Sequence, residues 1–356
     1  MSQFLNPRLH ALSPYTPGEQ PSDKSLVKLN TNECPYPPSP KAVKAAAEEA
    51  QRLHLYADPG CTAAKQALAG ALGVQADEVL AGNGSDEVLT LVFAAFCPQG
   101  VAFADITYGL YPVLAGLFGL TPVIVPLREN FALLPEDYAR LACTVIIANP
   151  NAPTGLALPC RQIEVLLRQN PDRLVVVDEA YVDFGAESAV PLLRQYPNLL
   201  VTGTFSKSRA LAGGRFGYAV GGRELIADLE RIRCSFNPYN VNRMTMAAAS
   251  AAAEDTGYFE ECRRKIIATR QRSLQALRAL GFEAADSAAN FVFVRHPALP
   301  GEILYRRLRE AGVLVRRWDA PRIKDYLRIS IGTDAQMDTL LAALQNILAA
   351  GKEVPV

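Results

Sequence analysis

The segment Thr204-Phe205-Ser206-Lys207 directly follows the apolar run Leu199-Leu200-Val201, and Arg215 comes eight residues after the lysine. The apolar run predicts a buried strand, so Lys207 lies just beyond the strand's end. A lysine amine can form a Schiff base with an aldehyde. Hydroxyls, backbone N–H groups and an arginine can hold a phosphate. Pyridoxal 5'-phosphate (PLP) requires both, although taken alone a lysine in such a loop is more often a solvated surface group.

The composition describes an ordinary globular chain of 356 residues with a formal net charge of zero, a length that suggests roughly two domains. The balanced charge gives no reason to expect a nucleic acid or an anionic membrane as partner. Seven scattered cysteines without a C-x-x-C pair, and an N-terminus without an apolar signal sequence, predict reduced thiols and a cytoplasmic protein. The three histidines are far apart, which argues against a metal site and against a Ser-His-Asp triad.

Strand and helix signals alternate along most of the chain. Near-continuous apolar runs, such as residues 144–148 and 174–177, predict strands covered on both faces of a largely parallel sheet. Strands are expected near 79–81, 101–104, 122–126, 144–149, 174–178, 199–203 and 217–220, and helices at 109–119, 159–169 and 223–234. After residue 240 the pattern changes to a long helical stretch, 241–280, interrupted near Gly257. Strands near 290–295, 313–316 and 326–331 and helices at 301–311 and 334–349 complete the chain.

This pattern predicts an N-terminal arm (1–28), a large cofactor-binding domain (29–240) and a smaller α+β domain (241–356) that takes in part of the arm. In open α/β sheets, ligands bind beyond the carboxyl ends of the strands. Polar residues follow four of the predicted strands: Gly82-Asn83-Gly84-Ser85, Asn149 to Gly155, Asp178 to Tyr181, and Ser206-Lys207. We expect them to share one site, with Ser85 as the N-cap of a helix whose N-terminus suits a phosphate.

Asp178 ends a strand of three valines, where a buried carboxylate is costly unless a cation pairs with it. A protonated pyridine nitrogen would supply that cation. Tyr181 could reach the phenolic oxygen of the same ring, and Tyr108 could stack on its face. A lone tyrosine is, however, more often simply part of a core.

Taken together, these motifs make the chain resemble the fold-type I, PLP-dependent aminotransferases over nearly its full length, and among them most closely the histidinol-phosphate aminotransferases. The resemblance implies a mostly parallel seven-stranded sheet sandwiched by helices, a smaller α+β domain, and an obligate homodimer. The motifs are Leu29-Asn30-Thr31-Asn32-Glu33, Tyr56-Ala57-Asp58-Pro59, Gly84-Ser85-Asp86-Glu87, Thr107-Tyr108-Gly109, Pro153-Thr154-Gly155, Asp178-Glu179-Ala180-Tyr181, Ser206-Lys207 with Arg215, and Leu327 to Thr333.

The resemblance also implies roles for single residues. Lys207 would hold the cofactor and shuttle a proton, Asp178 would pair with the pyridinium, and Tyr181 would hydrogen-bond the ring oxygen. The phosphate would be bound by Ser85, Asp86, Thr204, Ser206, Arg215, and Tyr56 from a second subunit. The substrate would be bound by Tyr15, Asn32, Arg316 and Arg328, because an arginine fork suits a carboxylate or a phosphate.

The sequence departs from the family at Ala152, where most members carry an asparagine that bonds the ring oxygen. Either Asn151 substitutes for it or Tyr181 alone holds that oxygen. The expected reaction is amino transfer between L-histidinol phosphate and 2-oxoglutarate in histidine biosynthesis. Aromatic amino acid transamination, phosphothreonine decarboxylation and a catalytically silent PLP-binding paralogue stay open. A nicotinamide-dependent dehydrogenase would need a G-x-G-x-x-G turn after the first strand, which is missing.

Overall fold

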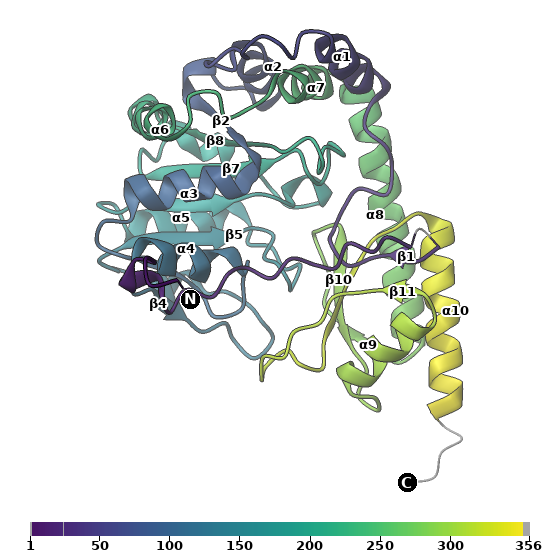
Figure 1. Ribbon diagram of the computed structural model, residues 1–356. Coiled ribbons are helices and arrows are strands. Elements are labelled where there is room, and N and C mark those ends of the chain that lie inside the picture. The colour runs from purple at the N-terminus through teal and green to yellow at the C-terminus, as the bar shows by residue number, and fades with distance from the viewer. Residues whose placement is uncertain (1, 24, 352–356) are drawn as a thin grey trace.

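The computed structural model describes residues 2–23 and 25–351. Its larger domain is built on a seven-stranded sheet with the order β2-β8-β7-β6-β5-β3-β4 (Figure 1). The sequence prediction of a seven-stranded sheet is therefore confirmed for the described residues. The strands are β2 (Val79–Asn83), β3 (Val101–Ala104), β4 (Val123–Val125), β5 (Thr144–Ala148), β6 (Val175–Asp178), β7 (Leu199–Thr204) and β8 (Phe216–Gly221).

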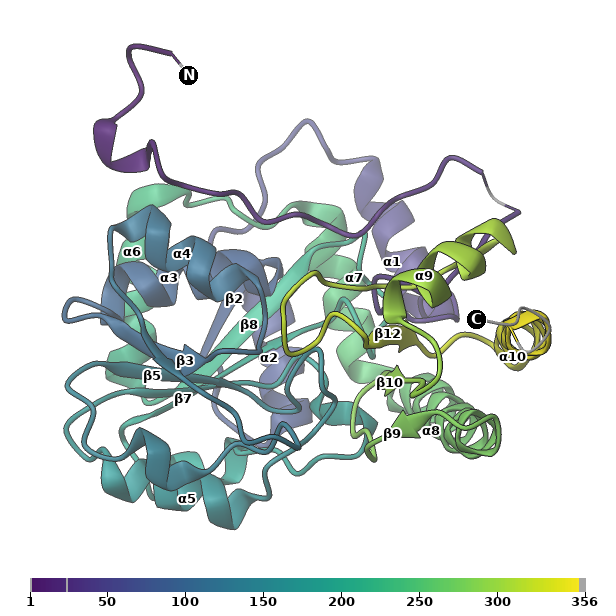
Figure 2. The same cartoon turned by 90° about the horizontal axis from the view of Figure 1, so that it is seen from below.

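The sheet is parallel from β7 to β4, and β8 runs antiparallel to both of its neighbours. Helices cover both faces, which explains why the central strands are continuous apolar runs (Figure 2). One face packs against α3 (Gly84–Phe96), α4 (Leu110–Phe118) and α6 (Arg223–Phe236). The other face packs against α5 (Cys160–Gln169) and, at the β2–β8 end, against α1 (Pro40–Ala50), α2 (Thr62–Leu72) and α7 (Arg243–Glu254).

The turn between β2 and α3 differs from the prediction. Helix α3 begins at Gly84, with Asn83 at the N-cap, so the expectation that Ser85 caps this helix is wrong. Gly84 has a φ of 78°, a conformation that glycine adopts without strain. Gly217 of β8 packs so closely on this turn that a Cβ there would lie 2.3 Å from the Ser85 nitrogen. This close packing sets the N-terminus of α3 directly beside β8.

The smaller domain contains a three-stranded antiparallel sheet with the order β12-β10-β9. Its strands are β9 (Glu283–Ala284), β10 (Phe291–Arg295) and β12 (Leu327–Ser330), and they pack against α8 (Thr256–Ala279), α9 (Gly301–Glu310) and α10 (Asp334–Gly351). A separate parallel pair joins β1 (Val27–Lys28) to β11 (Val313–Leu314). The N-terminal arm thus crosses the molecule and ends in the smaller domain (Figure 2).

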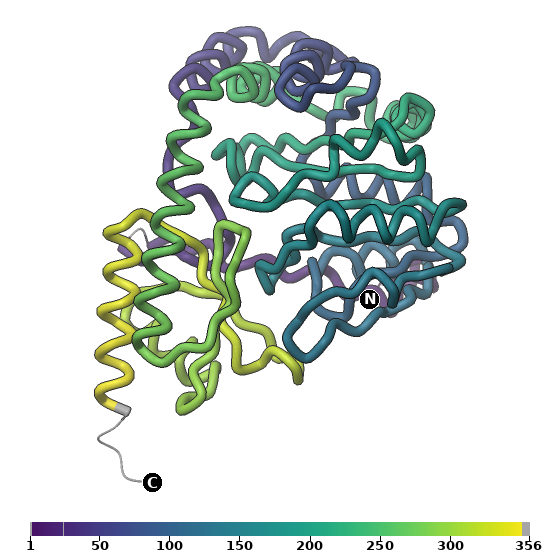
Figure 3. The backbone as a smooth tube through the Cα atoms, turned by 180° about the vertical axis from the view of Figure 1, so that it is seen from behind, coloured from purple at the N-terminus to yellow at the C-terminus, as the bar shows by residue number. Residues whose placement is uncertain are grey.

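The helical stretch predicted for 241–280 is two helices that meet at Asp255. Helix α7 packs on the larger domain through Ala248, Ala249 and Ala252, whereas α8 runs down to the smaller domain (Figure 3). We therefore propose that the domain division predicted at residue 240 falls at Asp255 instead. The pairing of β1 with β11 supports the assignment of part of the arm to the smaller domain.

All seven cysteines are free thiols. Within residues 2–23 and 25–351, no helix has the length and apolar character needed to cross a membrane.

Candidate active site

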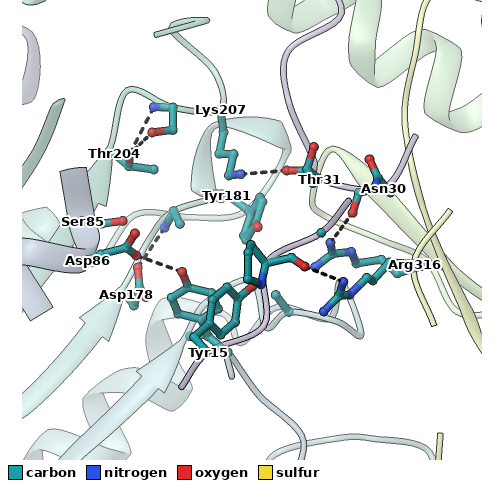
Figure 4. A pocket seen from close by; sticks show the side chains of 18 of the residues that line it. Tyr15, Asn30, Thr31, Ser85, Asp86, Asp178, Tyr181, Thr204, Lys207 and Arg316 are labelled. Carbon is teal, nitrogen blue, oxygen red and sulfur yellow. Dashed lines mark hydrogen bonds between the residues drawn. The ribbon is translucent and has the colours of Figure 1, made fainter. Parts of the chain in front are cut away.

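A cavity lies where the carboxyl ends of the parallel strands face the smaller domain and the N-terminal arm (Figure 4). All four polar strand ends expected from the sequence contribute residues to it. The predicted site residues that line it are Tyr15, Ser85, Asp86, Tyr108, Asp178, Tyr181, Thr204, Ser206, Lys207, Arg215, Arg316 and Arg328. The structure thus brings most of the predicted set together, while their chemical roles stay predictions.

Lys207 projects into the cavity from the loop after β7, and its Nζ donates a hydrogen bond to the carbonyl oxygen of Thr31 at 3.1 Å. Burial, together with the positive charge of Arg328, lowers the pKa of Lys207 from 10.5 to about 8. With a pKa of about 8, about a tenth of the Lys207 amines are neutral at pH 7 and about half at pH 8. Lys207 is therefore a competent nucleophile toward an aldehyde.

Asp178 is the last residue of β6 and is only 3% exposed. Its carboxylate accepts hydrogen bonds from the Tyr111 hydroxyl at 2.8 Å and from the Ala180 N–H at 3.3 Å. Among the ion pairs of the described residues, none involves Asp178. Burial raises the pKa of Asp178 to about 6. The site thus holds a buried carboxylate that lacks a cation.

The hydroxyl-rich end of the cavity lies at the N-terminus of α3. The Ser206 N–H donates to Thr204 Oγ1 at 3.1 Å. The Arg215 guanidinium contacts Ser206 Oγ at 3.3 Å and Asp86 Oδ2 at 3.2 Å. The Tyr108 hydroxyl also donates to Asp86, at 2.9 Å. Hydroxyls, an arginine and a helix N-terminus in one place form a site for a phosphate.

The opposite end of the cavity carries two arginines, Arg316 and Arg328, which face each other across an antiparallel bridge. Arg316 donates to the carbonyl oxygens of Thr16 at 2.8 Å and Pro17 at 3.1 Å, and so holds the arm across the cavity. Arg328 donates to the carbonyl oxygen of Asn30 at 2.9 Å, while its Nε is buried without a partner. Neither arginine forms an ion pair with any acid that the structure describes.

These charges fit PLP. The unpaired Asp178 carboxylate suits a protonated pyridine nitrogen, the Arg215 end suits the phosphate, and the Lys207 amine suits the aldehyde. The groups are arranged around one cavity, with Lys207 between the Ser85–Asp86 turn and Arg316 (Figure 4). An anion on a second ligand would find the two arginines at the far end.

Three predicted site residues do not line the cavity. Asn151 donates its side-chain amide to the Ile106 carbonyl and to Thr154 Oγ1, so it is committed to its own loop, whereas Ala152 does line the cavity. Asn32 is 1% exposed and donates to the Tyr181 hydroxyl at 3.0 Å. Tyr56 is 79% exposed on the outer surface and stacks on Tyr239.

Sequence reasoning missed several groups that the structure places at the site. The arm residues Pro17, Gly18 and Gln20 line the cavity, and Tyr111 binds Asp178 from α4. Tyr111 follows the quoted Thr107-Tyr108-Gly109 motif by two residues, and this short spacing was the one available signal. The arm residues carried no such signal, because they belong to none of the quoted motifs; Pro17, for example, contributes its main-chain carbonyl oxygen to Arg316.

Comparisons with known proteins agree with this geometry. The profile of the family described as aminotransferase class I and II matches residues 24–344. The histidinol-phosphate aminotransferase of a Marinomonas species is 53% identical over 353 residues, which cover 98% of this chain and all of that protein. The histidinol-phosphate aminotransferase of Acinetobacter baylyi is 49% identical and covers 96% of this chain and 97% of its own length.

Solved structures are similar as well. The crystal structure of histidinol-phosphate aminotransferase from Sinorhizobium meliloti in complex with pyridoxal-5'-phosphate superposes with a TM-score of 0.84. Its sequence identity is 29%, and the match covers 91% of each chain.

Proposed function

The chain belongs to the aminotransferase class I and II family, and we propose that it transfers an amino group between L-histidinol phosphate and 2-oxoglutarate with PLP as its cofactor. Relatives of about half-identical sequence that bear this activity in their names support the choice. PLP is supported by the Sinorhizobium meliloti enzyme, which carries it, and by the fit of the cavity.

The observation that carries the proposal is a pair of opposite charges in one cavity, neither with an ionic partner among the described residues. Asp178 lacks a cation at one side, and Arg328 lacks an anion at the other. A buried charge without a partner is unfavourable unless a ligand completes it. A cationic ring nitrogen and a phosphorylated or carboxylated substrate would complete both at once.

When bound, PLP supplies an aldehyde that captures amines and a ring that accepts the electrons of a broken C–H bond. The residues of this chain then have distinct tasks. Lys207 Nζ would hold the cofactor and would move the proton of the substrate Cα. Asp178 keeps the ring nitrogen protonated, while Arg215 and the Thr204 and Ser206 hydroxyls bind the phosphate.

The substrate tasks fall to the arginine end. Arg328 presents its fork to the anionic group of the substrate, and a planar fork binds a carboxylate or phosphate through two hydrogen bonds. Tyr15 lies beside Tyr108 and contributes an aromatic wall next to the arginines. The arm held by Arg316 covers the cavity and helps to exclude water.

We also propose that two copies form a homodimer in which Tyr56 reaches the partner's phosphate site. Tyr56 does not line its own cavity, and it stacks on Tyr239 at the surface of a chain that exposes further apolar side chains. These are Val43, Leu53, Leu55, Phe236 and Tyr239. Exposed apolar patches of this kind mark interfaces. The free thiols support the further expectation of a reducing, cytoplasmic environment.

A single-turnover experiment tests the reaction. PLP-loaded protein is mixed separately with histidinol phosphate, phenylalanine and phosphothreonine, and the visible cofactor band is followed. Rapid bleaching by histidinol phosphate alone is expected. A preference for phenylalanine would make the chain an aromatic aminotransferase, and release of carbon dioxide from phosphothreonine would make it a decarboxylase. If no visible band appeared after PLP addition, Lys207 would not form a Schiff base with PLP, and the proposed function would be wrong.

The shared site is tested by mixing two inactive variants, Tyr56→Ala and Lys207→Ala, after dissociation. Hybrid dimers contain one site with both residues intact, so activity should return to a fraction of the wild-type value. Absence of any regained activity in confirmed hybrid dimers would contradict the placement of Tyr56 at the partner's site.

A further inference from the structure

The contacts of Asn32 assign it a task different from the substrate binding expected of it. We propose that Asn32 is a positioning residue that aims the hydroxyl hydrogen of Tyr181 into the cavity, where it serves as the single side-chain donor to the ring oxygen of PLP. This inference rests on the proposed PLP chemistry and deepens it, because it concerns which side chain donates to the ring oxygen when residue 152 is an alanine.

The side chain of Asn32 is clamped on both sides. The Ser330 hydroxyl accepts the Asn32 backbone N–H at 2.8 Å and donates to Asn32 Oδ1 at 2.9 Å. With Oδ1 held in this way, Nδ2 faces the Tyr181 oxygen and donates to it at 3.0 Å. The side-chain amide of Asn290 also holds the Asn32 backbone, because it donates a hydrogen bond to the Asn32 carbonyl oxygen at 3.0 Å.

The direction of the hydrogen bond to Tyr181 matters. The Tyr181 oxygen accepts from Asn32, and it has no second hydrogen-bond partner among the described residues. Its own hydrogen is therefore free to point elsewhere, and Tyr181 lines the cavity. The ring cannot swing away, because it packs edge-on against Phe291 with centroids 5.0 Å apart. Burial also raises the pKa of Tyr181, so the hydroxyl stays protonated and remains a donor.

The alternative donors are absent or occupied. Ala152 lines the cavity, and a methyl group donates no hydrogen bond. The side-chain amide of Asn151 already donates hydrogen bonds to the Ile106 carbonyl oxygen and to Thr154 Oγ1. Asn32 itself is 1% exposed and lies behind Tyr181, so it acts through Tyr181 and not on the ligand directly.

The backbone explains why asparagine suits this position. Asn32 has a φ of 55°, in the left-handed region that asparagine and glycine tolerate better than other residues. That conformation turns the side chain between Ser330 of the smaller domain and Tyr181 of the larger one. Asn32→Gly is therefore the appropriate probe, because it removes the amide without straining the chain or adding a charge.

The readout is the pH at which the visible absorbance of the lysine–PLP linkage changes, measured without any substrate. A donor to the ring oxygen withdraws negative charge from it and so lowers the proton affinity of the neighbouring nitrogen. Loss of one hydrogen bond to a charged oxygen should raise this apparent pKa by about one unit. The other groups around Tyr181 are Arg328, Asp178, Asp86, Lys207, Tyr15, Tyr108 and Tyr111, and they are unchanged in every variant that keeps Tyr181.

The decisive experiment is a double-mutant cycle with Tyr181→Phe. Asn32→Gly and Tyr181→Phe should each raise the apparent pKa, and Asn32→Gly should add no further shift when Tyr181 is already phenylalanine. Asn290→Ala is the comparison variant, because it loosens the Asn32 loop but leaves the Asn32 side-chain amide in place, and it should shift the apparent pKa by clearly less than Asn32→Gly.

Two results would overturn the assignment. One is a shift from Asn32→Gly that persists in full in the Tyr181→Phe background, which would mean that Asn32 acts independently of Tyr181. The other is an Asn290→Ala shift as large as that of Asn32→Gly, which would reduce the effect to general loosening. Both measurements use PLP-bound protein without substrate. They therefore test the role of Asn32 independently of the proposed reaction, which the substrate experiment tests.

Discussion

Replacing Asp178 by asparagine should stabilise the cofactor-free protein and weaken the loaded enzyme. The carboxylate is 3% exposed, receives two hydrogen bonds and has no cation partner among the described residues. Its pKa is raised from 3.8 to about 6 by burial. Because one pKa unit corresponds to about 1.4 kcal/mol, keeping it ionised costs about 3 kcal/mol of folding free energy at pH 8.

The sign follows from linkage. Between the unfolded pKa of 3.8 and the folded pKa of about 6, the folded protein holds a proton that the unfolded chain has lost. The contribution of Asp178 to stability therefore falls as the pH rises through this window, and stays at its low value above it. Asp178→Asn does not titrate, so its advantage over the wild type should be absent near pH 4 and reach up to about 3 kcal/mol at pH 8.

Urea denaturation of the cofactor-free proteins at several pH values and one protein concentration measures this gap. Asp172→Asn, at an exposed turn, is the matched control and should show no pH-dependent gap. Added PLP should stabilise the wild type more than the variant, and turnover of the variant should fall by on the order of 100- to 1000-fold. A variant less stable than the wild type at pH 8, or a gap that does not change with pH, would refute the reasoning.

Further predictions concern the lysine and the arginine end of the cavity. Lys207→Ala should abolish the visible band and turnover together, and a variant with near-wild-type turnover would remove the lysine from catalysis. In the wild type, the rate at which PLP attaches to the cofactor-free protein should rise with pH through about 8 and then level off, because only the neutral amine attacks. Stopped-flow absorbance measures this profile, and in Arg328→Gln its midpoint should move to higher pH, since a charge that lowers the Lys207 pKa is gone. Arg328→Lys should raise KM for histidinol phosphate about 10- to 100-fold with PLP binding intact, because the lysine keeps the charge and loses the two-pronged contact; an unchanged KM would place the substrate anion elsewhere. Arg309→Ala breaks an exposed pair with Glu19 and should leave the free energy of unfolding almost unchanged, because water screens the two charges; a clear loss of stability in urea denaturation would contradict that view of the pair.

The larger domain was predictable because its signals are local. Apolar runs such as Val175-Val176-Val177 are each buried on both faces, and the polar residue that ends the run, Asp178, marks the sheet edge where ligands bind. Lys207 follows from the same logic. The predicted N-cap of α3, Ser85, lies two residues after the observed one, Asn83, because Gly84 at a positive φ already starts this helix, whereas capping preferences favour the serine.

The parts that could not be predicted depend on contacts between distant segments. The expectation that Asn32 binds substrate came from its motif, whereas its partners Tyr181 and Ser330 lie far along the chain. Arg316 is held by main-chain carbonyl oxygens of the arm, and such acceptors leave no mark in a sequence. The two-residue strands β1 and β9 are too short to show a periodic pattern.

The pairing of Val27–Lys28 with Val313–Leu314 bears on how the protein matures during its synthesis. All strands of the large sheet lie between these two segments, so the ribosome releases that sheet well before the partner of β1 exists. The larger domain can form first, while the arm and the smaller domain wait for the last tenth or so of the chain. The part of the cavity that carries Arg316 and Arg328 then forms last. A nascent chain can therefore expose Lys207 before it can bind a substrate.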